Sequence, residues 1–376
     1  MIYRDFKGKK ISALGLGCMR LPTVNGKEGE IDVEKSAEMF DYAIKSGINY
    51  FDTAWDYHKG TSEQVTGEIL SKYPRESYFL TSKFPGYNIE NIKKKEEIFE
   101  EQLRRCRTDY FDFYLFHCIT DTNIDTYLDP RHDLYGYVKQ LKEDGRVRHV
   151  GFSVHASIDT TKRFLEKYGD IIEFIQVQLN YLDLTYQDAQ AKIELARERG
   201  IPVWVMEPLR GGKLASLSEE YMGMLSHHAS MSAVEWAFRF IQSIPEVAVT
   251  LSGMSSMEQL EDNVRIFSEI KPLSKEALAT LNEISRDMQA NRLLPCTKCQ
   301  YCVSACPLEL NIPYLLRLYN EHTFTGGEFI VPPILRKVAK NRLPSACLGC
   351  RSCEAVCPQA IKISEVLSDF ADRMGF

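Results

Sequence analysis

The residues best suited to chemistry are eight cysteines near the C-terminus. The chain has 376 residues and 11 cysteines, of which Cys18, Cys106 and Cys118 lie scattered before the others. The remaining cysteines form two copies of the pattern C-x-x-C-x-x-C-x-x-x-C-P, at Cys296, Cys299, Cys302, Cys306, Cys347, Cys350, Cys353 and Cys357. In a reducing compartment, cysteines clustered in this way indicate metal binding rather than disulfides.

The spacing within each run indicates [4Fe–4S] clusters. Three cysteines at intervals of three residues surround one cubane, and the fourth leads away to the other cluster of the pair. We therefore assign one cluster to Cys296, Cys299, Cys302 and Cys357, and the other to Cys347, Cys350, Cys353 and Cys306. Zinc is the alternative, because C-x-x-C pairs also make zinc sites, although zinc needs neither the third cysteine nor the closing proline.

A second set of polar residues follows three expected strands in the first half of the chain. Asp52 ends one strand, and its loop FDTAWDYHKGTSE carries Tyr57. Lys83 ends the next strand and His117 the one after it. Each has an ordinary structural explanation when taken singly, as a cap, a packed ring or a core histidine. Four complementary groups on consecutive strand ends point instead to one site.

The elements that must position these residues alternate between strands and helices. We expect a hairpin at 2–14 and then eight strands at 14–17, 48–54, 78–84, 111–117, 148–154, 171–179, 201–206 and 246–253. Helices are expected at 33–45, 62–73, 91–106, 135–145, 158–169, 187–200, 232–243 and 256–267. Eight such units in about 270 residues fit an α/β fold of the closed (β/α)₈ TIM-barrel type, whose chemistry sits at the C-terminal strand ends. A doubly wound sheet is the alternative, but the run after the first strand lacks GxGxxG.

Three segments are expected: a barrel at 1–272, a linker helix at 273–293, and an α-helical, loop-rich cluster domain at 294–376. The insert between the cysteine runs holds a helix around 313–320 and a basic stretch, which is either a solvated face or a docking surface for an acidic redox partner. A formal net charge of -6 argues against nucleic acid as a partner. Neither a membrane span nor a signal peptide is evident, so we expect a cytoplasmic protein.

The region from about Lys9 to Phe267 resembles the aldo-keto reductase family. The resemblance is carried by GINYFDTAWDY, LTSKF, LFH, GFSVH, IQVQLNY, MEPLRGGKL and LSGMSSMEQLEDN, in this order. It maps the family's catalytic tetrad onto Asp52, Tyr57, Lys83 and His117. The C-terminal region resembles the bacterial two-cluster ferredoxins, with a long insert at 307–346. Together they imply an NAD(P)H-dependent oxidoreductase that reduces a small carbonyl compound and carries two [4Fe–4S] clusters.

The tetrad suits hydride addition to a carbonyl. The oxygen that gains charge needs a proton and aimed donors. Tyr57 would supply the proton, and the nearby Lys83 ammonium would lower the pKa of this tyrosine from its usual ~10. Asp52 would hold Lys83 in place, and His117 would orient the carbonyl.

The resemblance also implies residues along the track of the dinucleotide. They are Gly17, Cys18, Met19, Ser153, Gln176, Met206, Pro208, Leu209, Arg210, Gly211, Gly253, Ser255, Gln259 and Asn263. Met206 stands where many members stack a tyrosine on the nicotinamide. Gly253 and Gln259 replace the usual Lys and Arg for a 2′-phosphate, so NADH competes with NADPH as the expected cofactor.

Trp55 and Cys118 either line the substrate pocket or pack elsewhere, and the cluster domain is expected near the active site. Three roles for the clusters remain open. They are structural or regulatory in a carbonyl reductase, or they relay electrons to or from the barrel, for example through a flavin or a partner ferredoxin. In the third, the chain is a non-enzymatic electron-transfer or redox-sensing subunit, which the complete tetrad disfavours.

Overall fold

The computed structural model describes residues 1–27, 29–294, 296, 299–325 and 331–375. The chain divides into two compact units, Met1–Leu278 and Ala279–Phe376. The first contains every strand of the described residues, and the second contains both cysteine runs.

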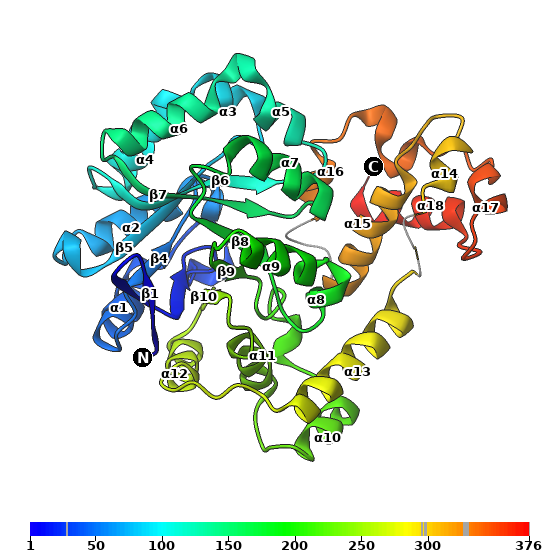
Figure 1. Ribbon diagram of the computed structural model, residues 1–376. Coiled ribbons are helices and arrows are strands. Elements are labelled where there is room, and N and C mark those ends of the chain that lie inside the picture. The colour runs from blue at the N-terminus through cyan, green and yellow to red at the C-terminus, as the bar shows by residue number, and fades with distance from the viewer. Residues whose placement is uncertain (28, 295, 297–298, 326–330, 376) are drawn as a thin grey trace. The chain divides into compact units, whose positions relative to one another are not determined.

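The first unit is a closed barrel of eight parallel strands in the order β10-β3-β4-β5-β6-β7-β8-β9, surrounded by helices (Figure 1). The strands are β3 (Leu14–Gly17), β4 (Tyr50–Asp52), β5 (Phe79–Phe84), β6 (Phe111–Ile119), β7 (Val147–Val154), β8 (Phe174–Gln178), β9 (Val203–Met206) and β10 (Val247–Ser252). The predicted (β/α)₈ barrel is therefore confirmed, and the doubly wound sheet is wrong. All eight strands were expected near these positions, because each is a short apolar run between helical patterns.

The helices that cover the barrel follow the expected pattern with one difference. They are α1 (Val33–Lys45), α2 (Ser62–Leu70), α3 (Ile89–Lys93), α4 (Lys95–Cys106), α6 (Leu134–Glu143), α7 (Ile158–Tyr168), α9 (Ala189–Glu198), α11 (Ala233–Gln242) and α12 (Met257–Ile266). The helix expected at 91–106 is interrupted at Lys94, whose backbone is not helical at φ -116° and ψ 27°. Three consecutive lysines at this point offer no apolar side chain to pack on the barrel.

An N-terminal hairpin packs against one end of the barrel. β1 (Tyr3–Phe6) pairs antiparallel with β2 (Lys9–Ser12). The buried ring of Phe6 lies 5.5 Å from the ring of Phe113 and 5.3 Å from that of Trp204. Burying a ring of this size contributes roughly 2–3 kcal/mol. The hairpin lies near the starts of the barrel strands. An active site is expected at the opposite end of the barrel, where the strands have their carboxyl ends.

Short helices that the sequence did not predict lie in the loops that follow the barrel strands. They are α5 (Ile124–Leu128) after β6, α8 (Asp183–Tyr186) after β8 and α10 (Glu219–Ser226) after β9. Helices of four to eight residues give too few turns for a recognisable 3.6-residue repeat.

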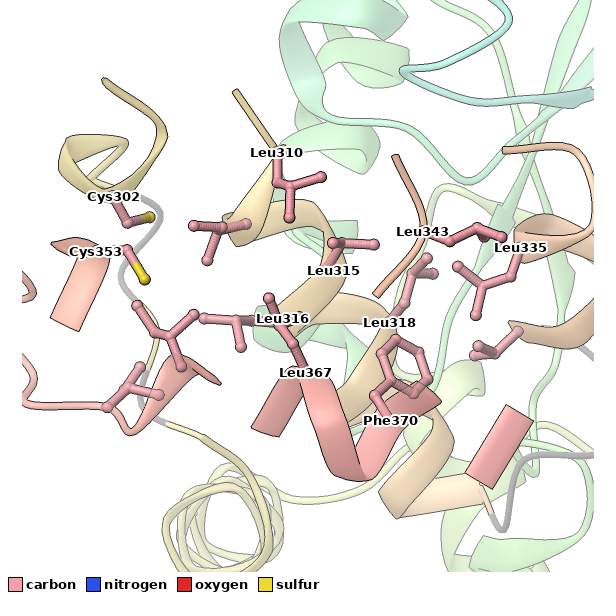
Figure 2. Packing of buried hydrophobic residues seen from close by; sticks show 14 residues of the cluster. Cys302, Leu310, Leu315, Leu316, Leu318, Leu335, Leu343, Cys353, Leu367 and Phe370 are labelled. Carbon is pink, nitrogen blue, oxygen red and sulfur yellow. The ribbon is translucent and has the colours of Figure 1, made fainter. Parts of the chain in front are cut away.

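The second unit begins within α13 (Lys275–Arg292), the expected linker helix. It contains α14 (Tyr301–Ser304), α15 (Ile312–Thr325), α16 (Val331–Leu335), α17 (Ser352–Ala355) and α18 (Ile363–Met374). An apolar core joins these helices, and Cys302 and Cys353 lie at one end of it (Figure 2). Within the described part of the chain, we find no helix with the length and apolar character needed to cross a membrane.

Candidate active site and cluster-binding cysteines

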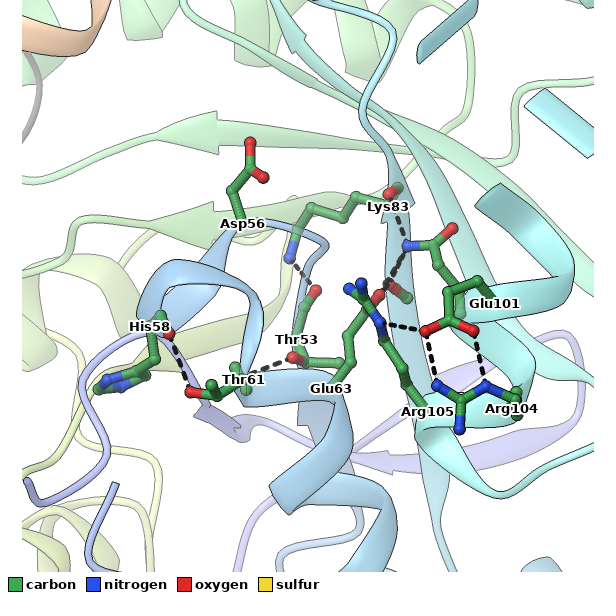
Figure 3. Close-up of polar contacts among 12 residues, drawn as sticks. Thr53, Asp56, His58, Thr61, Glu63, Lys83, Glu101, Arg104 and Arg105 are labelled. Atoms are coloured by element: carbon green, nitrogen blue, oxygen red, sulfur yellow. Dashed lines mark hydrogen bonds and ion pairs between the residues drawn. The ribbon is translucent and has the colours of Figure 1, made fainter. Parts of the chain in front are cut away.

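A buried ion pair forms the centre of the site at the carboxyl ends of β4 and β5. The ammonium of Lys83 lies 2.5 Å from Oδ1 of Asp52. It donates a second hydrogen bond, of 2.7 Å, to the carbonyl of Thr53 (Figure 3). Both charged side chains are almost completely buried, at 0% and 3% exposure. Burial disfavours the charged form of Lys83, but Asp52 and Tyr57 outweigh it and raise the pKa of the ammonium. Lys83 therefore remains a cation at neutral pH.

Tyr57 lies directly against this cation. Nζ of Lys83 is 4.7 Å from the centre of the Tyr57 ring, and the ring of His117 is 6.1 Å away in an edge-on arrangement. Burial raises the pKa of Tyr57, and the charge of Lys83 only partly offsets this rise. The net direction is opposite to the sequence expectation, because desolvation of the phenolate outweighs one neighbouring charge. Tyr57 is therefore a protonated phenol at neutral pH.

The loop after Tyr57 has an unusual backbone. His58 and Lys59 both have positive φ values, 50° and 55°, followed by Gly60 at 91°. The loop is held by its side chains, because Nε2 of His58 accepts a hydrogen bond from the Leu21 amide at 3.0 Å and Thr61 donates to the His58 carbonyl at 2.8 Å. Non-glycine residues in this region store strain that surrounding contacts must compensate. The sharp turn fixes where the Tyr57 ring enters the barrel mouth.

Three predicted cofactor residues meet on neighbouring strands. Ser153 on β7 accepts a hydrogen bond of 2.8 Å from the Cys118 amide, and Gln176 follows on β8. The amide nitrogen of Gln176 is 3.6 Å from the sulfur of Met206 on β9. Its carbonyl oxygen, Oε1, is buried and has no hydrogen-bond partner among the described residues. An orphaned acceptor here fits a ligand with an amide N–H, such as the carboxamide of nicotinamide.

The other predicted cofactor residues lie in loops after β3, β9 and β10. Gly17 and Cys18 are buried at the end of β3, and Met19 is exposed beyond them. The Ser255 amide donates to the Gln259 side chain at 2.8 Å, and the Ser255 hydroxyl donates to the Arg20 carbonyl at 2.8 Å. Asn263 donates to Ser252 at 2.9 Å, so its amide holds the end of β10.

In the loop Pro208–Gly211, the arginine side chain pairs with a buried carboxylate of the protein rather than pointing toward a ligand phosphate. The Arg210 side chain is completely buried and its Nε lies 3.0 Å from Oδ2 of Asp183, which is also buried. The same carboxylate accepts hydrogen bonds from Gln178 at 2.8 Å and Asn180 at 2.7 Å. This network ties the loops after β8 and β9 together and holds the Arg210 side chain inside the protein.

In the second unit, the cysteines assigned to one cluster surround one pocket. A small pocket is lined by Cys296, Cys299 and Cys302 of the first run and by Cys357 of the second. The walls of the pocket are apolar and would shield a bound metal cluster from water; they are formed by Pro313, Leu316, Ile361 and Ile363. Among the described residues, no three His, Cys, Asp or Glu side chains are grouped to hold a single metal ion. The thiolate donor set and the apolar walls fit an iron–sulfur cluster.

The second run mirrors the first. α14 and α17 each carry the third cysteine of their run, and each follows a residue in the left-handed region, Gln300 at φ 71° and Arg351 at φ 61°. Burial raises the pKa of Cys353 to about 11, and the neighbouring Cys347 and Cys306 add to the rise. Cys306 of the first run thus lies near cysteines of the second run.

Comparison with protein families gives two matches. The aldo/keto reductase family model matches residues 13–286, and a 4Fe-4S dicluster domain model matches residues 295–361. The first match alone covers more than half of the chain. The chain belongs to the aldo/keto reductase family. Its C-terminal region is a 4Fe-4S dicluster domain of the ferredoxin type, as the cysteine spacing predicted.

Individual relatives match the barrel. A probable aldo-keto reductase of Glycine max is 27% identical over 73% of this chain and 72% of its own length. The NADH-specific methylglyoxal reductase of Escherichia coli is 27% identical over 56% of this chain and 68% of its own length. Among solved structures, the holo form of aldo-keto reductase AKR11C1 from Bacillus halodurans is 26% identical, with a TM-score of 0.62, and covers 76% of this chain and 96% of its own.

This aldo/keto reductase also has a polar network behind Lys83 that the sequence did not reveal. The buried carboxylate of Glu63 on α2 accepts hydrogen bonds of 2.6 Å from both Ser82 and Gln102 (Figure 3). Gln102 donates further to the Lys83 carbonyl at 3.1 Å, and Arg105 pairs with Glu63 at 3.3 Å. Burial raises the pKa of Glu63 despite these partners. The network holds the backbone on which Lys83 stands.

Two residues with open roles are placed by the structure. The Trp55 ring packs under the guanidinium of Arg105 at 3.8 Å, which favours packing over a pocket-lining role. Cys118 has a positive φ of 59° at an irregularity in the pairing of β6 with β7, and Asn123 donates to its carbonyl at 2.8 Å. The Cys118 turn thus re-aims the end of β6, directly after His117.

Proposed function

We propose that this aldo/keto reductase reduces an aldehyde or ketone to an alcohol at the expense of NADH or NADPH, with Tyr57 as general acid. The observation that carries the proposal is the buried Lys83 ammonium, held 2.5 Å from Asp52 and 4.7 Å from the Tyr57 ring. Such a cation stabilises negative charge that develops beside it far better than water-exposed lysine does.

Tyr57, Lys83 and Asp52 would have different roles in the proposed proton transfer. The raised pKa of Tyr57 keeps its phenol protonated, which is the form that a proton donor needs. When the phenol gives its proton to the carbonyl oxygen, Lys83 stabilises the phenolate. Asp52 keeps Lys83 in position, so little reorganisation is required. His117, whose ring lies 6.1 Å from that of Tyr57 and 5.3 Å from that of Tyr87, would donate a hydrogen bond to the carbonyl.

The reduced nicotinamide, when bound, supplies the hydride. Gln176 and Ser153 would hold its carboxamide, and Met206 would pack on the ring with a thioether in place of an aromatic face. The loop after β9 would take the pyrophosphate on its backbone, while Gly253, Ser255, Gln259 and Asn263 would border the adenosine. We favour NADH over NADPH, because Gly253 and Gln259 offer no cation for a 2′-phosphate and a relative is named for its NADH specificity.

The test is turnover of a panel of small aldehydes and ketones by the protein purified without oxygen. Tyr57→Phe should lower kcat roughly 10²–10⁴-fold, because it removes the proton donor while keeping the ring. Tyr3→Phe is the matched control, since Tyr3 lies in the N-terminal hairpin and its hydroxyl donates to the Gly47 carbonyl. Equal rates for the wild type and Tyr57→Phe would show that the general-acid assignment is wrong.

A second candidate function is electron relay through two [4Fe–4S] clusters. It is favoured by the complete cysteine set, in which Cys357 joins Cys296, Cys299 and Cys302 around one pocket. Bound clusters exchange single electrons. Anaerobic titration with NADH and NADPH, followed by cluster absorbance and EPR, separates the two functions. Cluster reduction supports relay, and carbonyl turnover without cluster reduction leaves the clusters a structural or regulatory role.

A further inference from the structure

Arg20 lies across the loops that follow three barrel strands, yet neither the family motifs nor the tetrad assigns it a role. Its side chain runs over Gly253, where an added Cβ would lie 3.2 Å from Cβ, Cγ and Cδ of Arg20. Its guanidinium lies over Gly211, with Nη2 3.4 Å from the position of a Cβ there. The Arg20 carbonyl accepts a hydrogen bond of 2.8 Å from Ser255. Two glycines therefore make room for this cation, and a serine fixes its backbone.

Glu207 supplies the anion that faces this cation. Its Oε1 lies 3.8 Å from Nη2 of Arg20. The backbone of Glu207 is in the left-handed region, at φ 56°, and its carbonyl accepts hydrogen bonds of 3.0 Å from both Asn180 and the Arg210 amide. Burial raises the pKa of the Glu207 carboxyl, although Arg20 and the Gly211 amide oppose the rise. A strained backbone thus aims a carboxylate at the Gly211 amide and Arg20, the donors that an anionic ligand would use.

The two arginines beside this loop differ in how firmly they are held. Arg210 is fully buried and lies 3.0 Å from Asp183, whereas Arg20 is 24% exposed and meets Glu207 only at 3.8 Å. The Arg210 guanidinium is therefore enclosed within the protein, whereas the Arg20 guanidinium lies over Gly211 at a partly exposed position that a ligand can reach.

We infer that Arg20 binds the pyrophosphate of the dinucleotide cofactor, and that Glu207 is the internal anion which this pyrophosphate displaces. The inference rests on the proposed nicotinamide-dependent function and names a binding residue for it. An arginine fork matches two phosphate oxygens at once, while a carboxylate beside a phosphate repels it. Glu207 therefore competes with the cofactor for the same donors.

The test measures dissociation constants of NADH and NADPH with the full-length protein purified without oxygen. Arg20→Gln keeps the three carbons that pack on Gly253 and removes the guanidinium, and we expect about 10- to 100-fold weaker binding of both dinucleotides. Glu207→Gln should tighten binding about 3- to 10-fold, because it removes the competing charge. Inorganic pyrophosphate should displace NADH from the wild type and lose this ability in Arg20→Gln. Arg131→Ala, which removes an exposed cation paired with Asp129, is the control.

The outcomes separate this inference from the function on which it rests. A wild type that binds neither dinucleotide overturns both. A wild type that binds NADH while Arg20→Gln binds it equally tightly overturns the role of Arg20 alone. Weaker binding in Glu207→Gln overturns the competing role of Glu207. If Arg20→Gln fails to fold, Arg20→Lys keeps the charge without the fork and should bind NADH with intermediate affinity, and wild-type affinity there counts against the inference.

Discussion

In the barrel, Lys83 is held 2.5 Å from Asp52 by the protein alone, and Glu63, Ser82 and Gln102 support it from behind. In the C-terminal unit, four cysteines line one pocket, but among the described residues no three metal-binding side chains converge on a single ion. The barrel site is organised by buried ion pairs and hydrogen bonds, whereas the cysteine site has an apolar wall and thiol donors that bound metal would draw together. We therefore expect the barrel to be destabilised by loss of its buried ion pair, and the C-terminal unit by loss of bound metal.

The largest difference between the two units is expected when metal binding is prevented. Metal sites of this kind contribute to folding directly, on the order of 10 kcal/mol for structural zinc sites. Cys353→Ser removes a proposed cluster ligand that is buried against the core of the C-terminal unit. We expect the variant to lose cluster absorbance and hydrogen-exchange protection in Ala279–Phe376, with protection in Met1–Leu278 unchanged.

Cys106→Ser is the matched control, because Cys106 is also a buried cysteine but lies at the end of α4 in the barrel unit. It should retain cluster absorbance and protection in the C-terminal unit. If Cys353→Ser kept full protection there, metal would not be needed to organise that unit. If protection fell equally in both units, the two would not fail separately.

The next largest effect is expected from Lys83→Met, which leaves the buried Asp52 carboxylate without its ion-pair partner. Removing one member of a buried pair typically costs about 3–5 kcal/mol of the free energy of unfolding. We expect such a loss for the barrel by calorimetry, together with a fall in kcat of at least about 10²-fold, because the phenolate of Tyr57 is no longer stabilised. Cluster absorbance should not change.

The double variant Asp52→Asn, Lys83→Met sharpens this prediction. It replaces both charges of the pair, so part of the lost stability should return while kcat stays low. Loss of stability without loss of activity in the single variant would mean that Lys83 is only a structural ion.

Elements with a repeating pattern could be predicted from the sequence, whereas contacts between residues far apart in the chain could not. Eight strand–helix units predicted the barrel, and strand-end positions predicted that Asp52, Lys83 and His117 would face one mouth. Glu63 and Gln102 gave no signal, because they lie on separate helices and meet only after the barrel closes. Arg20 and Glu207 gave no signal either, because they lie far apart in the chain and meet only in the folded barrel. The pKa direction of Tyr57 was missed because burial is a property of the fold rather than of the motif.

The smallest predicted effect is on the stability of the barrel unit at acid pH. Burial raises the pKa of Glu173, but hydrogen bonds from His149 and Lys142 outweigh it and lower this pKa to about 2. Glu173 also pairs with Lys7 of the N-terminal hairpin at 3.3 Å. Since the folded pKa lies below the unfolded value, the stabilisation is present above about pH 4.5 and is lost as pH falls toward 2.

Glu173→Gln should lower the free energy of unfolding of the barrel by roughly 1–3 kcal/mol at pH 7. It should also flatten the pH dependence of this free energy between pH 5 and about pH 2. Urea unfolding across this range checks the prediction, with Glu90→Gln, an exposed carboxylate on α3, as control. A parallel acid profile for wild type and Glu173→Gln would mean that another carboxylate sets the acid stability of the barrel.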